Sequence, residues 1–176
     1  MKNQSNGLFL IGMPGSGKST IGKGLAKALG RVFVDLDHEI EARCGVAIPV
    51  IFEIEGEQGF RKRESQVLQE VVKQDDLVLA TGGGAVLAPQ NREILSQQGR
   101  VIYLKASVDE LHRRTSRDRN RPLLATNDPK ARLQELFEQR SPIYEYLADM
   151  VVETGSASVP MVVQQIVTRL REMEDK

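Results

Sequence analysis

Short apolar runs alternate along the chain with longer stretches of mixed polarity. The runs at residues 8–11, 77–80 and 101–104 have the length and the flanks of buried parallel strands. Two weaker candidates, residues 32–34 and 150–152, are each bounded by an acidic residue. These runs are the predicted strands of a sheet.

The stretches between the runs repeat their apolar residues at helical spacing. Residues 21–29, 67–72, 133–137 and 163–170 each place apolar side chains three or four positions apart, as one face of a helix requires. Strands that alternate with helices favour βαβ units with right-handed crossovers. We therefore predict a three-layer α/β domain built on a parallel sheet.

Two segments fit this alternation poorly. Residues 48–58 make the connection between the second and third predicted strands unusually long, and residues 113–129 are rich in arginine and interrupted by proline. Insertions of this kind often form lids or substrate pockets. Both segments are candidates for that role.

Composition narrows the class of protein. The 176 residues suit a single domain, and 24 basic residues balance 24 acidic ones, so the broad positive field of a nucleic-acid binder is not expected. One cysteine, Cys44, and two histidines exclude an internal disulfide and disfavour a Cys- or His-rich metal centre. The apolar runs are too short for a signal peptide or a membrane span, so we expect a cytoplasmic protein without a membrane partner.

The strongest chemical signal is the sequence GMPGSGKS at residues 12–19, which satisfies G-x-x-x-x-G-K-[ST]. It follows a predicted strand and opens a predicted helix. Glycines let backbone N–H groups crowd around phosphate oxygens, and the helix N-terminus adds a positive dipole end. Lys18 is placed to reach the β- and γ-phosphates of ATP, and Ser19 offers a hydroxyl to Mg²⁺.

Two carboxylates, Asp35 and Asp37, follow the second predicted strand. Residues two apart on an extended segment face the same side, so both side chains are expected in the cleft at the carboxyl ends of the strands. One would hold Mg²⁺ through water, and the other would accept a proton from a substrate hydroxyl. The alternative is a helix N-cap at Asp37 beside a solvated Asp35.

Three consecutive glycines, Gly82, Gly83 and Gly84, follow the third predicted strand. Because glycine costs backbone entropy, a merely structural turn rarely needs three, and the run indicates close approach of a ligand to the backbone. A loose strand–helix connection is the other interpretation.

Four arginines complete the candidate site. Arg61 and Glu64 are i, i+3 on a predicted helix, so the carboxylate can orient the guanidinium, although a surface ion pair has the same spacing. Arg140 is undistinguished by itself, yet two arginines at one pocket would bind a carboxylate bidentately. Residues 113–121 fit a lid that brings Arg121, and less firmly Arg114, onto phosphates; without interleaved aromatic residues they do not resemble a nucleic-acid patch.

Taken together, these residues resemble the shikimate kinases, a family of small P-loop kinases in aromatic amino-acid biosynthesis. The matching motifs are GMPGSGKST (12–20), DLD (35–37), GEQGFRKRE (56–64), ATGGG (80–84), RPLL (121–124) and RSPIY (140–144). The match runs from Gly12 to about Ala148. The phosphate loop alone names a superfamily, whereas the ordered combination is much more specific.

The resemblance implies Mg²⁺-dependent phosphoryl transfer from ATP to the 3-hydroxyl of shikimate, with shikimate 3-phosphate and ADP as products. The implied residues for ATP are Gly12, Gly15, Ser16, Gly17, Lys18, Ser19 and Thr20, with Arg121 on the phosphates and Arg114 beside the adenine. The implied residues for shikimate are Asp37, Arg61, Gly82, Gly83, Gly84 and Arg140. Lys18, Asp37 and Arg121 would be catalytic, and Ser19 and, through water, Asp35 would support the metal.

The resemblance also implies the P-loop fold, with a five-stranded parallel sheet in the order 2-3-1-4-5. Residues 1–176 would form one domain, residues 36–71 a helical substrate-binding region and residues 112–125 a mobile lid. The neutral charge and the absence of a coiled-coil repeat lead us to expect a monomer.

One segment departs from the family pattern. The loop after the last predicted strand has Ala157 where relatives carry a polar or basic residue near the adenine, so any contact with the base there would come from backbone. Two alternatives stay open. A kinase of another small metabolite, such as gluconate, would share the phosphate loop and lid but would not need the pocket of Asp37, Arg61 and Arg140. A nucleotide-dependent binding protein would not need an intact set of Lys18, Ser19, Asp37 and Arg121.

Overall fold

The computed structural model describes residues 6–116 and 121–176. Its centre is a parallel sheet of five strands in the order β2-β3-β1-β4-β5. The strands are β1 (Gly7–Ile11), β2 (Val32–Asp35), β3 (Leu77–Ala80), β4 (Gly99–Lys105) and β5 (Met150–Glu153). The predicted strand positions and the 2-3-1-4-5 order are confirmed; β4 alone is clearly longer than its apolar run, because its ends carry Gly99, Arg100 and Lys105.

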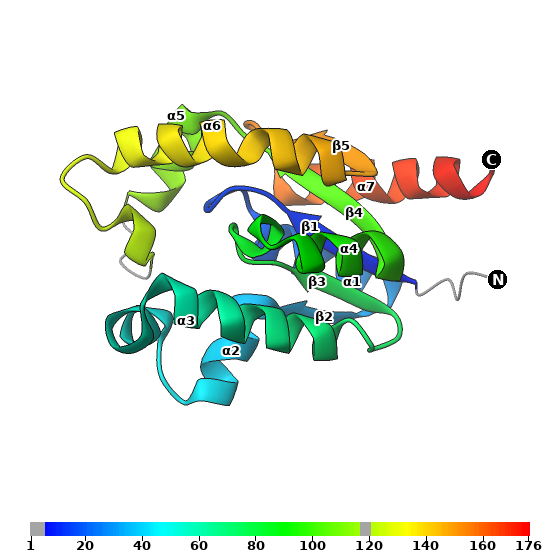
Figure 1. Cartoon of the computed structure of the whole chain (residues 1–176). Coiled ribbons are helices and arrows are strands. Elements are labelled where there is room, and N and C mark those ends of the chain that lie inside the picture. Colours follow the sequence, from blue (N-terminus) through cyan, green and yellow to red (C-terminus); the bar gives the residue numbers. More distant parts are fainter. Residues whose placement is uncertain (1–5, 117–120) are drawn as a thin grey trace.

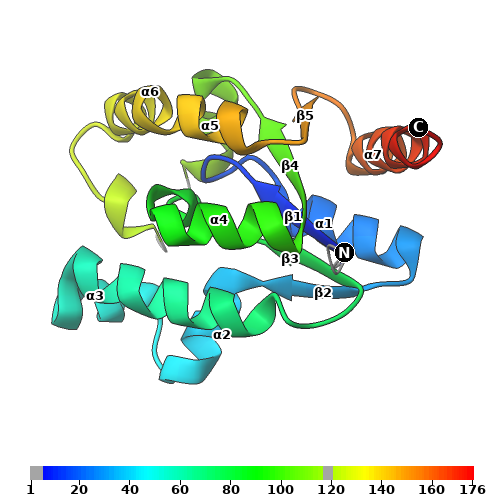
Figure 2. The same cartoon turned by 45° about the vertical axis from the view of Figure 1, so that its right-hand side comes forward.

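Helices cover both faces of the sheet (Figures 1 and 2). They are α1 (Lys18–Leu29), α2 (Leu36–Cys44), α3 (Ile48–Val71), α4 (Pro89–Gln98), α5 (Val108–Thr115), α6 (Pro129–Leu147) and α7 (Val159–Glu174), with short 3-10 turns at Ala85–Leu87 and Pro122–Leu124. Alternate residues of β1 divide the core. Leu8 and Leu10 pack with α1 and α7, whereas Phe9 and Ile11 pack with α3, α4 and α6.

The predicted substrate-binding region is helical. Residues 36–71 form α2 and α3, which lie beside β2 at one edge of the sheet (Figure 1). Gly56 interrupts α3 with a φ of 72° and a ψ of −179°, so two helical segments meet there. Only glycine adopts this backbone conformation without strain.

The arginine-rich segment is described in part. Its first residues belong to α5, and it resumes at Arg121 before the turn Pro122–Leu124. Residues 117–120 of the predicted lid lie outside the described residues. Within the described part of the chain, no helix has the length and apolar character needed to cross a membrane.

Candidate active site

The phosphate loop connects β1 to α1, as its motif predicts. Gly12, Gly15 and Gly17 all have positive φ angles of 151°, 84° and 96°. A Cβ atom on Gly12 would lie 2.6 Å from the carbonyl oxygen of Leu104, so this position has no room for a side chain. The ammonium of Lys18 donates to the carbonyl oxygens of Gly12 at 2.7 Å and Met13 at 2.9 Å, which curls the loop around the lysine.

Burial makes Lys18 electrostatically unusual. Burial and the positive charge of Arg121 together lower the pKa of the ammonium to about 7, against the opposing effect of Asp37 and Asp35. An anion bound beside the ammonium would favour its charged form. The loop is therefore poised to take up a phosphate.

The two aspartates reach the cleft by a different route from the one predicted. The chain does not stay extended after β2: α2 begins at Leu36, Asp35 is its N-cap, and the Asp35 carboxylate accepts from the His38 N–H at 3.1 Å. The extended-segment argument is therefore wrong, and so is the alternative that placed the cap at Asp37. Both carboxylates nevertheless line one cleft, because the first turn of α2 directs Asp37 back toward the loop.

The residues beside the loop suit a divalent cation. The Ser19 hydroxyl donates to the Asp35 carboxylate within the cleft that Lys18 lines. The described residues contain no cluster of three or more His, Cys, Asp or Glu side chains that could hold a metal alone. Mg²⁺ does not require one, since it keeps several waters and is usually bound through one or two protein oxygens plus substrate phosphates. Ser19 and Asp35 fit that donor set.

The glycine run makes room for the protein's own functional groups. A Cβ on Gly82 would lie 2.7 Å from Asp37 Oδ1 and 2.8 Å from Glu64 Oε2. One on Gly83 would lie 3.1 Å from Arg140 Nη1, and one on Gly84 would overlap the Arg61 guanidinium. The run is thus tightly packed and is not a loose connection. It brings two carboxylates and two guanidinium groups against one backbone segment.

The resulting pocket holds buried charge. Glu64 is 1% exposed and pairs with Arg61 at 3.0 Å, so the surface interpretation of this pair is wrong. Arg140 is 2% exposed although nothing in its local sequence marks it. Both arginines line the pocket together with Asp37 and the three glycines. Charged groups so far from water are well placed to bind a charged ligand.

Glu64 makes the stability of the free protein depend on pH. Burial raises the pKa of its carboxyl from 4.5 to about 7, with Arg61 opposing and Asp37 reinforcing the shift. The folded protein then holds the proton more tightly than the unfolded chain, so this stabilising contribution is present below pH 4.5 and is lost as pH rises through 7. We expect the free energy of unfolding of Glu64→Gln to equal that of the wild type near pH 4.5. Above pH 7 it should be larger than that of the wild type by about 3 kcal/mol.

Denaturant titrations of both proteins across this pH range would measure the difference. Glu57→Gln is the matched control, because Glu57 also pairs with Arg61, at 3.5 Å, but is exposed. A stability difference between Glu64→Gln and wild type that did not change with pH would contradict the prediction.

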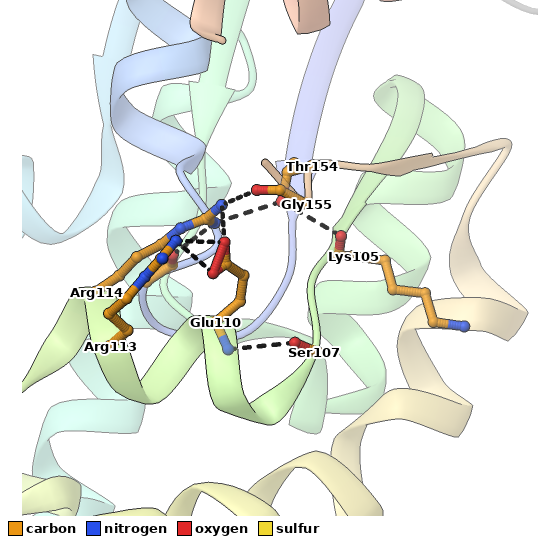
Figure 3. Close-up of polar contacts among 8 residues, drawn as sticks. Lys105, Ser107, Glu110, Arg113, Arg114, Thr154 and Gly155 are labelled. Atoms are coloured by element: carbon orange, nitrogen blue, oxygen red, sulfur yellow. Dashed lines mark hydrogen bonds and ion pairs between the residues drawn. The ribbon is translucent and has the colours of Figure 1, made fainter. Parts of the chain in front are cut away.

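Arg114 connects three segments at the other end of the cleft. Its guanidinium donates to the carbonyl oxygen of Gly15 at 3.2 Å, to Thr154 Oγ1 at 3.4 Å and to the carbonyl oxygen of Gly155 at 2.7 Å (Figure 3). A further cavity lies here, lined by Arg114, Ala157 and apolar residues of α1 and α7. Ala157 offers this cavity no polar side chain, and the expectation that the loop would contact an adenine through backbone stays a prediction.

The arginine pocket and the cavity beside Ala157 each adjoin the phosphate cleft, because each shares lining residues with it. The phosphate cleft, about 480 Å³ in volume, shares Gly17, Thr20 and Arg114 with the cavity beside Ala157. At its other end it shares Asp37, Gly83 and Arg121 with the arginine pocket. All the predicted site residues except Gly12 line one or more of these cavities: Gly15, Ser16, Gly17, Lys18, Ser19, Thr20, Asp35, Asp37, Arg61, Gly82, Gly83, Gly84, Arg114, Arg121 and Arg140.

Sequence reasoning missed part of the lining. His38 and Glu41 of α2 border the phosphate cleft, and Phe52 and Phe60 of α3 border the arginine pocket. The two phenylalanines are eight positions apart, so helical periodicity would have placed them on one face of an unbroken helix. Because Gly56 interrupts the helix between them, the spacing of the two phenylalanines in the sequence does not predict that they share a pocket.

Comparisons with known proteins agree with this geometry. A sequence model of the shikimate kinase family matches residues 14–171. The shikimate kinase of Bordetella avium is 60% identical over 169 residues, which cover 96% of this chain and 81% of that protein. The structure of "Shikimate kinase from Acinetobacter baumannii in complex with shikimate" superposes with a TM-score of 0.96 at 43% identity, covering 99% of this chain and 97% of that one.

A gluconokinase from Sinorhizobium meliloti shares the fold alone, with 16% identity and a TM-score of 0.58 over 96% of this chain and 93% of that one. The likeness to shikimate kinases is far stronger in both sequence identity and TM-score. The chain is an ATP-dependent kinase and belongs to the shikimate kinase family.

Proposed function

We propose that this chain transfers the γ-phosphoryl group of ATP to the 3-hydroxyl of shikimate in a Mg²⁺-dependent reaction, giving shikimate 3-phosphate and ADP. The observation that carries the proposal is the position of Asp37 where the phosphate cleft meets the arginine pocket. A carboxylate at that junction can contact an acceptor hydroxyl on one side and face the phosphoryl donor on the other.

The arginine pocket suits the acceptor. Shikimate is a carboxylate with three hydroxyl groups, and Arg61 and Arg140 supply the guanidinium groups that bind a carboxylate bidentately. Gly82, Gly83 and Gly84 bring backbone close to the bound ring, and Asp37 accepts from its hydroxyls. The buried Arg140 leaves little freedom for rearrangement, which favours a ligand of fixed shape.

The phosphate cleft suits the donor. We assign its β- and γ-phosphates to Lys18 and to the backbone of Gly12 and residues 15–20. Arg121 borders both cavities and is assigned to the transferring phosphoryl group, and Arg114 to the side of the adenine. Ser19 and, through water, Asp35 would hold Mg²⁺, which when bound neutralises charge on the phosphates.

In the proposed reaction the 3-hydroxyl oxygen attacks the γ-phosphorus as the bond to the β–γ bridging oxygen breaks. Asp37 accepts the hydroxyl proton, and ADP leaves with the bonding electron pair. Lys18 and Arg121 stabilise negative charge on the phosphoryl oxygens. The chain's contribution is thus positioning, charge stabilisation and one proton transfer.

We further propose that residues 1–176 form one kinase domain that acts as a cytoplasmic monomer, without a nucleic-acid or membrane partner. The family match over most of the chain supports the single domain. The balanced charge supports small molecules as its partners. A lid at residues 112–125 remains a prediction.

A coupled ADP-release assay tests the function. We expect turnover with ATP, Mg²⁺ and shikimate, and none above background when gluconate replaces shikimate or a chelator removes the metal. Turnover driven by gluconate would overturn the assignment of Arg61 and Arg140. Tight ATP binding without acceptor-dependent turnover would instead indicate a nucleotide-dependent binding protein.

A further inference from the structure

Tyr144 lies directly behind the glycine run. It belongs to α6, one helical turn after Arg140, and is 0% exposed. Its hydroxyl donates to the carbonyl oxygen of Gly83, 61 positions earlier in the sequence. It does not line the arginine pocket, so it would not touch a ligand bound there. Any influence on the reaction must therefore pass through the groups that its hydroxyl contacts, which are the glycine run and Arg140 on the same helix.

The hydrogen bond completes the anchoring of the glycine run. The carbonyl oxygens of Gly82 and Gly84 accept from the N–H groups of Ala85 and Leu87, each at 3.1 Å. These two bonds are local, whereas the bond from Tyr144 to Gly83 ties the middle of the run to a helix. Because C=O and N–H point in opposite directions across a trans peptide, it also turns the Gly84 N–H away from α6.

The position of this loop matters because its tolerances are small. Gly83 can lie against Arg140 and Pro14 only because it lacks a side chain. The same holds for Gly82 against Asp37 and for Gly84 against Arg61. A shift of a few tenths of an ångström would move the backbone into one of these groups or away from it. The same helix carries Arg140, so one element sets both the guanidinium and the loop.

We propose that Tyr144 is a positioning residue for the acceptor substrate: its hydroxyl fixes the Gly83–Gly84 peptide against α6 and so sets the shape of the shikimate pocket. The inference rests on the proposed function of that pocket. Gly83 also borders the phosphate cleft, but Lys18 and Ser19 lie on another connection of the fold, so we expect the larger effect on the acceptor. The tyrosine ring, which contacts Tyr103 at a centroid distance of 5.0 Å, serves the core separately.

Tyr144→Phe tests the proposal because it removes the hydroxyl and keeps the ring. It leaves the half-buried Gly83 carbonyl without its tyrosine donor, and we expect KM for shikimate to rise about tenfold while KM for ATP stays within about twofold. At a shikimate concentration that saturates the wild type, the increase in Tm that shikimate produces should be smaller in Tyr144→Phe. The increase in Tm that ADP produces should be unchanged.

Tyr103→Phe is the matched control, since it removes a buried hydroxyl from the neighbouring ring without a link to the glycine run. It should leave both KM values unchanged. Equal shikimate KM in Tyr144→Phe and wild type, or a rise shared by ATP, would overturn the positioning role. Shikimate-dependent turnover in the wild type would still uphold the proposed function; its absence would overturn that function and this inference together.

Discussion

Asp37→Asn is expected to lower kcat for shikimate phosphorylation by about 10²- to 10⁴-fold, the contribution of a well-placed general base. The amide keeps the size of the side chain and its contact with Gly82 but cannot accept the hydroxyl proton. Burial and the neighbouring Asp35 raise the pKa of the Asp37 carboxyl, while Lys18 and Arg121 oppose the shift. A carboxylate held in this way is a stronger base than one on the surface.

Steady-state kinetics and a separate ATP-binding measurement check this result. ATP affinity should be little changed, because the phosphate contacts lie on the loop. Glu39→Gln provides the control, since Glu39 is on the same helix and pairs with Arg43 away from the site. An Asp37→Asn enzyme that kept near-normal kcat would exclude Asp37 as the base. Parallel loss of ATP binding would point to a damaged fold.

Lys18→Met is expected to lower kcat by about 10²- to 10³-fold, the size of effect found when one preorganised charge-stabilising donor is removed. Methionine retains an apolar stem that fills the same volume but has no charge for the β- and γ-phosphates. The substitution also removes the donor to the carbonyl oxygens of Gly12 and Met13. We therefore expect a weaker affinity for ATP together with the loss of turnover.

Thermal unfolding separates this chemical effect from a structural one. Folding Lys18 into a site that lowers its pKa to about 7 is unfavourable for the ammonium, so Lys18→Met should not reduce Tm of the free protein. Lys27→Met, in the exposed last turn of α1, should behave as wild type in every measurement. A Lys18→Met enzyme with kcat within threefold of wild type would contradict the role assigned to Lys18.

Patterns in the amino-acid sequence were enough to predict the strands, the P-loop and the family. These depend on local patterns: apolar runs of strand length, helical spacing between them, and glycines at positions that require positive φ. The resemblance that the motifs carry then implied the sheet order and the set of residues at the site. Local chemistry carries this information because a phosphate loop needs particular residue types next to one another in the chain.

How those residues act together became visible only in the folded protein. Nothing local to Glu64 or Arg140 signals burial, and both are buried because α3 and α6 bring them against the glycine run. Asp35 is an N-cap because α2 begins at the next residue, Leu36. Tyr144 meets Gly83 because α6 packs beside β4 and the turn Ala85–Leu87 that follows the glycine run. Burial, pKa and close approach are properties of groups distant in sequence, so they exist only once the sheet has brought the ends of its strands together.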